Sequence, residues 1–245
     1  MRLKNRIAVV TGASRGIGLE VCRTFASEGA QVAMLARNQE ALDHAAEAIP
    51  GARAFSCDVG DPASVEQAFT AVRTALGDVD ILINNAALGE PRLMEEAVDG
   101  ELQRQVSVNL LGPIYCARAV IPMMRRRGLG DIINVSSESV STPYPLMGTY
   151  AATKSALETV SASLRSELRG SGIRVSIYRS GRVETGFSDD WSAELRAQIA
   201  RKAVECGFTA QSGERITPDI PARAMLAMLL VDRSAHVDLM QLRGA

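Results

Sequence analysis

Short runs rich in valine and isoleucine alternate with longer segments of helical period along this chain. Such alternation predicts βαβ units that feed a parallel sheet. The strands are predicted at Ile7–Thr11, Gln31–Ala36, Ala52–Cys57, Asp80–Asn84, Asp131–Ser136, Arg174–Tyr178 and His236–Gln241. The helices are predicted at Ile17–Ser27, Gln39–Ala48, Pro62–Ala75, Glu101–Arg127, Thr149–Arg169, Ala193–Val204 and Pro218–Leu230. This order predicts an α/β fold, a doubly wound three-layer sandwich around a seven-stranded parallel sheet.

Length and composition predict one domain over residues 1–245. The hydrophobic content of 47% is enough for one large core in a chain of 245 residues. The polar insert 186–217 contains the only tryptophan, Trp191. Because it lies between the sixth strand and the last helix, we expect it to act as a lid over a ligand.

Charge and cysteine content exclude several classes of function. A net charge of -1 gives no general attraction to nucleic acid or to an anionic membrane, and the basic run 125–127 is typical of a solvated helix end. The four cysteines have neither zinc-site nor disulfide spacing, so we expect no metal. The scattered cysteines favour a reduced, cytoplasmic setting. We expect no leader and no run of ~20 apolar residues, and therefore a soluble protein.

The segment Thr11–Gly18 follows the first strand and leads into the first helix. Gly12 permits a tight turn, Gly16 lets a pyrophosphate approach the backbone, and Gly18 allows close packing of helix on strand. The predicted phosphate contacts at this helix start are Gly12, Ser14, Arg15, Gly16, Ile17 and Gly18. The spacing differs from GxGxxG, so a plain strand-to-helix loop stays open. The loop lacks the Gly-Lys-Ser/Thr ending of ATP and GTP sites.

The second strand ends in Ala36 and Arg37, where a carboxylate would be expected for an unmodified ribose 2′-hydroxyl. Arg37 and Arg15 can instead make charge-assisted contacts to a 2′-phosphate. The pair therefore predicts NADP(H) over NAD(H). The alternative is that both arginines are surface charges.

Tyr150 and Lys154 lie one helical turn apart, and Ser137 ends a β-branched run before them. The spacing puts both side chains on one helix face. A free tyrosine has a pKa near ~10, which makes it a poor acid or base at neutral pH. A lysine charge beside it favours the phenolate, so we expect Lys154 to lower the pKa of Tyr150.

Together these motifs resemble the short-chain dehydrogenase/reductase family, in its NADP-preferring form, over nearly the whole chain. Cys57-Asp58-Val59 is similar to the family's adenine-contacting segment, and Asn84-Asn85-Ala86-Ala87 resembles its Asn-Asn-Ala-Gly motif. The resemblance implies a Rossmann-type fold. It implies the catalytic residues Asn109, Ser137, Tyr150 and Lys154. It also implies further cofactor contacts from Asp58, Val59, Asn85, Ala86, Tyr150, Lys154, Val183 and Thr185.

The chain departs from the family pattern at three places. Ala87 replaces the last glycine of the Asn-Asn-Ala-Gly motif, and 236–242 replaces a glycine-rich ending. Ser180 stands where the family usually has a proline. Because a serine restores an N–H and frees φ, we expect it to loosen this turn.

The resemblance implies an NADP(H)-dependent oxidoreductase that transfers a hydride between nicotinamide and a carbonyl or alcohol carbon. Tyr150 would be the acid/base, Ser137 and Tyr150 would bind the substrate oxygen, and Lys154 would hold the ribose. Asn109 would position a water. A largely apolar lining, with Leu88, Phe187 and Trp191 on one wall, predicts a small or medium hydrophobic substrate.

Two alternative functions and a homo-oligomeric assembly are also considered. One alternative is a catalytically inactive NADP(H)-binding sensor or scaffold, although a sensor would not need the four catalytic residues. A nucleotide-sugar epimerase is less compatible, because its relatives usually need a larger C-terminal region. The family resemblance implies a homotetramer, or else a dimer, formed through the long helices 101–127 and 149–169.

Overall fold

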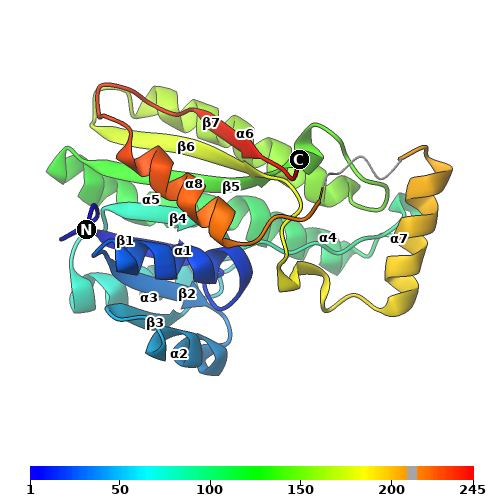
Figure 1. Ribbon diagram of the computed structural model, residues 1–245, viewed down its shortest axis with the longest axis horizontal. Coiled ribbons are helices and arrows are strands. Elements are labelled where there is room, and N and C mark those ends of the chain that lie inside the picture. The colour runs from blue at the N-terminus through cyan, green and yellow to red at the C-terminus, as the bar shows by residue number, and fades with distance from the viewer. Residues whose placement is uncertain (209–213) are drawn as a thin grey trace.

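A computed structural model describes residues 1–208 and 214–245 of the chain, as an α/β fold (Figure 1). The strands are β1 (Ile7–Thr11), β2 (Gln31–Ala36), β3 (Ala52–Ser56), β4 (Ile81–Asn84), β5 (Gly130–Ser137), β6 (Ile173–Ser180) and β7 (Leu239–Leu242). The helices are α1 (Gly16–Ser27), α2 (Gln39–Glu47), α3 (Pro62–Leu76), α4 (Asp99–Val106), α5 (Gly112–Arg127), α6 (Gly148–Glu167), α7 (Ala193–Glu205) and α8 (Asp219–Leu230). Shorter turns are η1 (Met94–Glu96), η2 (Ser107–Leu111), η3 (Glu138–Val140) and η4 (Gly186–Ser188).

The seven strands form one parallel sheet in the order β3-β2-β1-β4-β5-β6-β7. The predicted doubly wound sheet is therefore confirmed. The strand order reverses between β1 and β4, and in such sheets ligands bind outside the carboxyl ends of the strands at this point. The fold thus directs attention to the residues that follow β1, β4 and β5.

Two hydrophobic cores lie on opposite faces of the sheet. Helices α1, α2 and α8 cover one face with residues such as Phe25, Leu42 and Met225. Helices α3 and α5, together with the end of α6, cover the other, with residues such as Phe69 and Val120. Both faces of the central strands are buried, which explains their continuous apolar runs.

The helix predicted over 101–127 has an interruption that its period does not indicate. Its α-helical parts, α4 and α5, are joined by η2, a π-helical turn that contains Asn109. Such turns hold one extra residue and often occur at functional sites. The side chain of Asn109 is fully buried.

The last strand begins later than predicted, at Leu239 instead of His236. His236 forms side-chain contacts instead of ladder pairs. Its Nε2 lies 3.3 Å from Ser176 Oγ, and its Nδ1 lies 3.1 Å from Asp238 Oδ1. Side-chain partners thus replace sheet pairing before β7 begins.

Among the described residues, one helix is long and apolar enough to cross a membrane by length and composition, Asp99–Arg127. This differs from the expectation that no run approaches a span. The finding is weak evidence for a membrane, because core helices pass the same test. Cys116, Val120 and Met124 of this helix are buried against the sheet.

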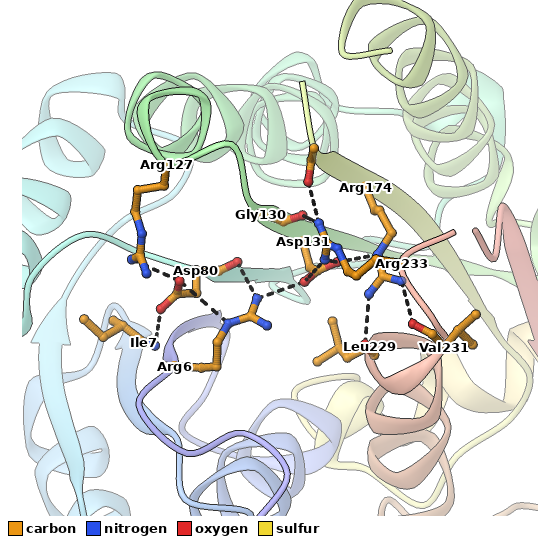
Figure 2. A network of polar contacts seen from close by, with 11 residues as sticks. Arg6, Ile7, Asp80, Arg127, Gly130, Asp131, Arg174, Leu229, Val231 and Arg233 are labelled. Atoms are coloured by element: carbon orange, nitrogen blue, oxygen red, sulfur yellow. Dashed lines mark hydrogen bonds and ion pairs between the residues drawn. The ribbon is translucent and has the colours of Figure 1, made fainter. Parts of the chain in front are cut away.

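A network of buried charges holds the amino ends of the central strands (Figure 2). Asp80 and Asp131, just before β4 and within β5, are 1% and 2% exposed. Asp131 accepts from Arg6 at 2.9 Å, Arg174 at 2.7 Å and Arg233 at 2.9 Å. Asp80 accepts from the Ile7 amide at 2.8 Å and pairs with Arg127 at 3.0 Å. The amino edge of the sheet is therefore tied by charge, while the carboxyl edge carries the candidate site.

The predicted lid, 186–217, includes η4 and α7, and residues 209–213 of it lie outside the described part of the chain. Ile216, near the end of the insert, forms a parallel bridge with Val183, which lies just before the insert. Its service as a lid, and the division of 1–245 into this insert and one domain, stay predictions.

Candidate active site

The glycine loop adopts a backbone that only small residues allow. Gly12 and Gly16 have φ of 64° and 56°. A Cβ on Gly18 would lie 2.3 Å from the Gly12 carbonyl oxygen and 2.6 Å from Asn85 Nδ2. The predicted close packing of this helix on the strand therefore depends on Gly18.

Thr11 and Asn85 fix the loop to the end of β4. The Thr11 hydroxyl accepts from the amides of Asn85 and Ala86, each at 3.0 Å. Asn85 Nδ2 donates to the carbonyls of Thr11 at 3.0 Å and Gly12 at 3.2 Å. The sequence identified Asn85 and Ala86 as cofactor contacts but missed Thr11. Its position beside a glycine loop is the only signal that could have found it.

Helix α1 begins at the loop, with Arg15 as its extended N-cap residue and Gly16 as its first residue. Arg15 is exposed, and its guanidinium lies 3.3 Å from Asp190 of the insert. Ser14 and Ile17 flank this start, so the predicted residues lie together where amide groups point outward. Gly16 packs against Thr185, since a Cβ there would lie 3.0 Å from Thr185 Cβ.

The residues predicted to meet the adenine end follow β2 and β3. Arg37 is exposed directly after β2. Asp58 follows β3, and its Oδ1 accepts from the Gly60 amide at 2.9 Å. Val59 is buried beside it and contacts the position of Gly112. These side chains therefore lie at the carboxyl edge on the β1–β2–β3 side.

Ser137, Tyr150 and Lys154 come together where α6 passes the end of β5. The Lys154 ammonium donates to the Val135 carbonyl at 2.8 Å and lies 5.9 Å from the centre of the Tyr150 ring. The Ser137 side chain lies close enough to the Tyr150 phenol to lower its pKa. The predicted catalytic triplet is thus one cluster.

Burial controls the acidity of this cluster. It raises the pKa of Tyr150 to about 12, although the nearby Ser137 side chain opposes this. Burial also lowers the pKa of Lys154 to about 8. The prediction that Lys154 lowers the pKa of Tyr150 is therefore wrong here, because lost solvation dominates. At neutral pH the phenol is protonated and the ammonium is charged.

Asn109 is held in η2 by the loop after β4. Its Nδ2 donates to the Leu88 carbonyl at 2.8 Å, and its Oδ1 accepts from the Leu88 amide at 2.9 Å. Its Nδ2 also lies 3.2 Å from Thr153 Oγ1, which donates to the Tyr150 carbonyl at 2.7 Å. Thr153, which the sequence interpretation missed, thus links Asn109 to the helical turn that carries Tyr150 and Lys154.

Comparison with known proteins agrees with this geometry. A family model for short chain dehydrogenases matches residues 6–196. A short-chain type dehydrogenase/reductase of Picea abies is 33% identical over 96% of this chain and 89% of its own length. The chain belongs to the short-chain dehydrogenase/reductase family.

Further relatives of this family include a 2,3-dihydro-2,3-dihydroxybenzoate dehydrogenase of Bacillus subtilis (strain 168). It is 30% identical over 96% of this chain and 92% of its own length. Among solved structures, a 3-ketoacyl-(acyl-carrier-protein) reductase from Brucella melitensis complexed with NADH has a TM-score of 0.87 and 28% identity. It covers 99% of this chain and 98% of its own. A metagenomic short-chain oxidoreductase in complex with NADP has a TM-score of 0.83 and 27% identity, with 100% of both chains covered.

Aromatic residues of the insert pack against the candidate catalytic cluster of this short-chain dehydrogenase/reductase. The Phe187 and Tyr150 ring centres are 5.6 Å apart, and Trp191 packs edge-on to Phe187 at 5.9 Å. Trp191 Nε1 donates to the Gly89 carbonyl at 3.1 Å. A Cβ on Gly89 would lie 2.9 Å from Phe187 and 3.0 Å from Met147. The absence of a side chain at Gly89 therefore leaves room for the Phe187 ring.

The departures from the family pattern are accommodated by ordinary backbone. Ser180 continues β6 and pairs with Ser137 and Leu242, and the Gly181 amide donates to Leu242 at 2.8 Å. Ser180 itself is thus paired with both neighbouring strands, and the expected loosening of the turn that follows it stays a prediction. Among described residues other than glycine, only Asn5 and Leu146 have positive φ, so Ala87 adds no left-handed strain.

Proposed function

We propose that this chain is an NADP(H)-dependent oxidoreductase of the carbonyl reductase or alcohol dehydrogenase type. It would transfer a hydride between nicotinamide and the carbonyl or alcohol carbon of a small or medium hydrophobic substrate. The observation that carries the proposal is the cluster of Ser137, Tyr150 and Lys154 at the same sheet edge as the glycine loop. The glycine loop would bind the phosphates and Tyr150 would donate the proton, and both lie at the carboxyl edge of the sheet.

The shape and charge of the loop fit a dinucleotide phosphate. A Cβ at Gly12 or Gly18 would strike neighbouring atoms, so the cradle exists only with glycine there. Arg37 and Arg15 supply exposed positive charge for a 2′-phosphate. Each charge-assisted contact contributes about 1.5–3 kcal/mol. Asp58, Val59, Asn85 and Ala86 would bind the adenosine side, and Val183 and Thr185 the nicotinamide amide.

The bound nicotinamide would supply or accept the hydride. Tyr150 would give its proton to the carbonyl oxygen, for which the protonated phenol is the required form. Ser137 would donate a hydrogen bond to the same oxygen as charge develops there. Lys154 would hold the ribose hydroxyls with its charged ammonium. Asn109 would position a water between Lys154 and solvent.

The lining of the cluster supports a hydrophobic substrate. Phe187 lies beside Tyr150, and Trp191 packs against the Phe187 ring. The Phe187 and Trp191 rings offer apolar surface near Ser137 and Tyr150, the two side chains that would bind the substrate oxygen. Such a site favours one carbonyl or hydroxyl on an otherwise apolar molecule.

The test is NADPH oxidation with a panel of ketones and aldehydes, with NADH and Tyr150→Phe in parallel. We expect turnover that prefers NADPH and falls at least about 100-fold in the variant. Thermal unfolding and NADPH binding of Tyr150→Phe should match wild type. Retention of more than a tenth of kcat would contradict the role of Tyr150. NADPH binding without turnover on the panel would favour the sensor or scaffold.

Assembly and location belong to the same proposal. We expect a homotetramer, with a dimer as the alternative, formed through α4–α5 and α6 in the cytoplasm. Val98, the N-cap residue of α4, and Val106, the last residue of α4, are 50% and 37% exposed, which leaves apolar surface there. Light scattering at micromolar concentration tests the assembly, and a monomer would contradict it.

A further inference from the structure

A partly buried ion pair lies directly behind the catalytic serine. Arg179 of β6 binds Glu158 of α6 through two bonds, Nε to Oε1 at 2.9 Å and Nη2 to Oε2 at 2.6 Å. The side chains are 17% and 14% exposed. The Ser136 hydroxyl donates to the same carboxylate at 2.6 Å. This bidentate geometry fixes both orientation and distance.

The pair sits in the chain of contacts that aligns α6 with β5. Lys154 donates to the Val135 carbonyl, and one turn later Glu158 accepts from Ser136. Asn134 donates to Ser161 at 2.8 Å further along. Because Ser136 precedes Ser137 and Glu158 follows Lys154 by one turn, the contact sets the position of both catalytic side chains.

Arg179 also reaches the turn that follows Ser137. Its Nη1 donates to Ser141 Oγ at 3.1 Å and Gln241 Oε1 at 3.3 Å. Inside this turn, the Ser139 amide donates to Ser137 Oγ at 3.2 Å, and the Ser141 amide donates to the Glu138 carbonyl at 3.0 Å. One guanidinium therefore joins β5, its following turn, α6 and β7.

We propose that Arg179 and Glu158 are positioning residues of the active site. They hold the end of β5 against α6, so that the Ser137 and Tyr150 hydroxyls can both hydrogen-bond the same substrate oxygen. The catalytic part of this inference rests on the proposed function. Since a misplacement of about 1 Å can cost 100-fold in rate, a clamp one residue from Ser137 controls turnover without touching substrate.

The same two strands offer a matched control at their other end. Arg174 of β6 binds Asp131 of β5 at 2.7 Å and is 10% exposed. It is an arginine–carboxylate pair that is buried even more deeply than Arg179 and Glu158, but it lies at the amino edge of the sheet. A purely structural role for Arg179 predicts the same kinetic behaviour for both arginines.

The kinetic experiment compares Arg179→Met, Glu158→Gln and Arg174→Met in the full chain. We expect kcat per folded molecule to fall at least about ten-fold in the first two, with the NADPH Kd within about two-fold of wild type. Arg174→Met should lower the Tm but keep kcat. Arg179→Lys should have a higher kcat than Arg179→Met, because lysine keeps the positive charge but cannot form the two parallel hydrogen bonds of the guanidinium. Unchanged kcat in both Arg179→Met and Glu158→Gln, or an equal loss in Arg174→Met, overturns the proposal.

Amide hydrogen exchange gives a readout that needs no substrate. Arg179→Met should accelerate exchange in the peptide that contains Ser139 and Ser141, whereas Arg174→Met should leave it unchanged. If Arg179→Met does not fold, the exchange rates of Glu158→Gln are compared with those of Arg174→Met instead. Unchanged exchange overturns the positioning role. If the wild-type protein shows no turnover, the proposed function fails. The hydrogen-exchange rates alone then test whether Arg179 and Glu158 hold the end of β5 against α6.

Discussion

Asp131→Asn is the substitution for which the structure predicts the largest effect away from the active site. Asp131 is 2% exposed and accepts from three arginines, Arg6, Arg174 and Arg233, at 2.7–2.9 Å. The asparagine keeps the shape but removes the charge that all three share. An uncompensated buried charge costs about 3–5 kcal/mol.

For a chain of this size, each kcal/mol shifts the Tm by about 2–4 °C, so the loss corresponds to roughly 6–20 °C. Urea unfolding followed by circular dichroism measures the free energy of unfolding, and a thermal scan measures the Tm. The control is Asp238→Asn. Asp238 is 71% exposed and lies 3.7 Å from Arg165, so its loss should cost less than about 1 kcal/mol.

A loss below about 1 kcal/mol in Asp131→Asn would refute the reasoning, because it would place the buried network in the energy range of surface pairs. Asp131 lies at the amino edge, opposite the catalytic cluster. At temperatures well below the lowered Tm, kcat should therefore match wild type.

Three further predictions concern the site. Arg37→Asp should invert the ratio of kcat/KM for NADPH and NADH, since one charge-assisted contact of about 1.5–3 kcal/mol is replaced by repulsion; an unchanged ratio would remove Arg37 from the phosphate site. Gly18→Ala should weaken NADPH binding at least about ten-fold in a fluorescence titration, because its Cβ would lie 2.3 Å from the Gly12 carbonyl; binding equal to wild type would argue against the cradle. Turnover should fall as pH rises above about 8, where Lys154 loses its proton, and a pH profile of kcat that stays level to pH 10 would contradict this.

The strands were predictable because the central ones are buried on both faces and have continuous apolar sequences. The π-helical turn was not, since its one extra residue shifts the phase of the apolar pattern at a single point, while the stretches on either side of it keep the helical period. Tyr150 shows a second limit. Its pKa depends on burial that includes contact with Phe187, a residue far along the chain, whereas the sequence showed only the nearby Lys154.

Side chains that act on backbone were the hardest to find. Thr11 and Thr153 bind carbonyls and amides, and threonine in such roles has no distinctive spacing. Arg179 lies on β6 and Glu158 on α6. Because the two residues are brought together only by the fold, neither one indicates from the sequence that the other is its partner. The glycine loop, Asp58, Asn85 and Ser137, by contrast, lie at or just after the ends of strands whose order the sequence already indicated.

The π-helical turn η2 has a consequence for the kind of mutation this chain tolerates. Each residue of an α-helix turns the chain by about 100°, so deleting one residue between α4 and α5 would rotate the two halves relative to each other by that amount. Either Asn109 would leave Leu88, or the face of α5 that carries Val120 would leave the sheet. The segment should therefore accept many substitutions yet no single-residue deletion, so its length is constrained more tightly than its composition.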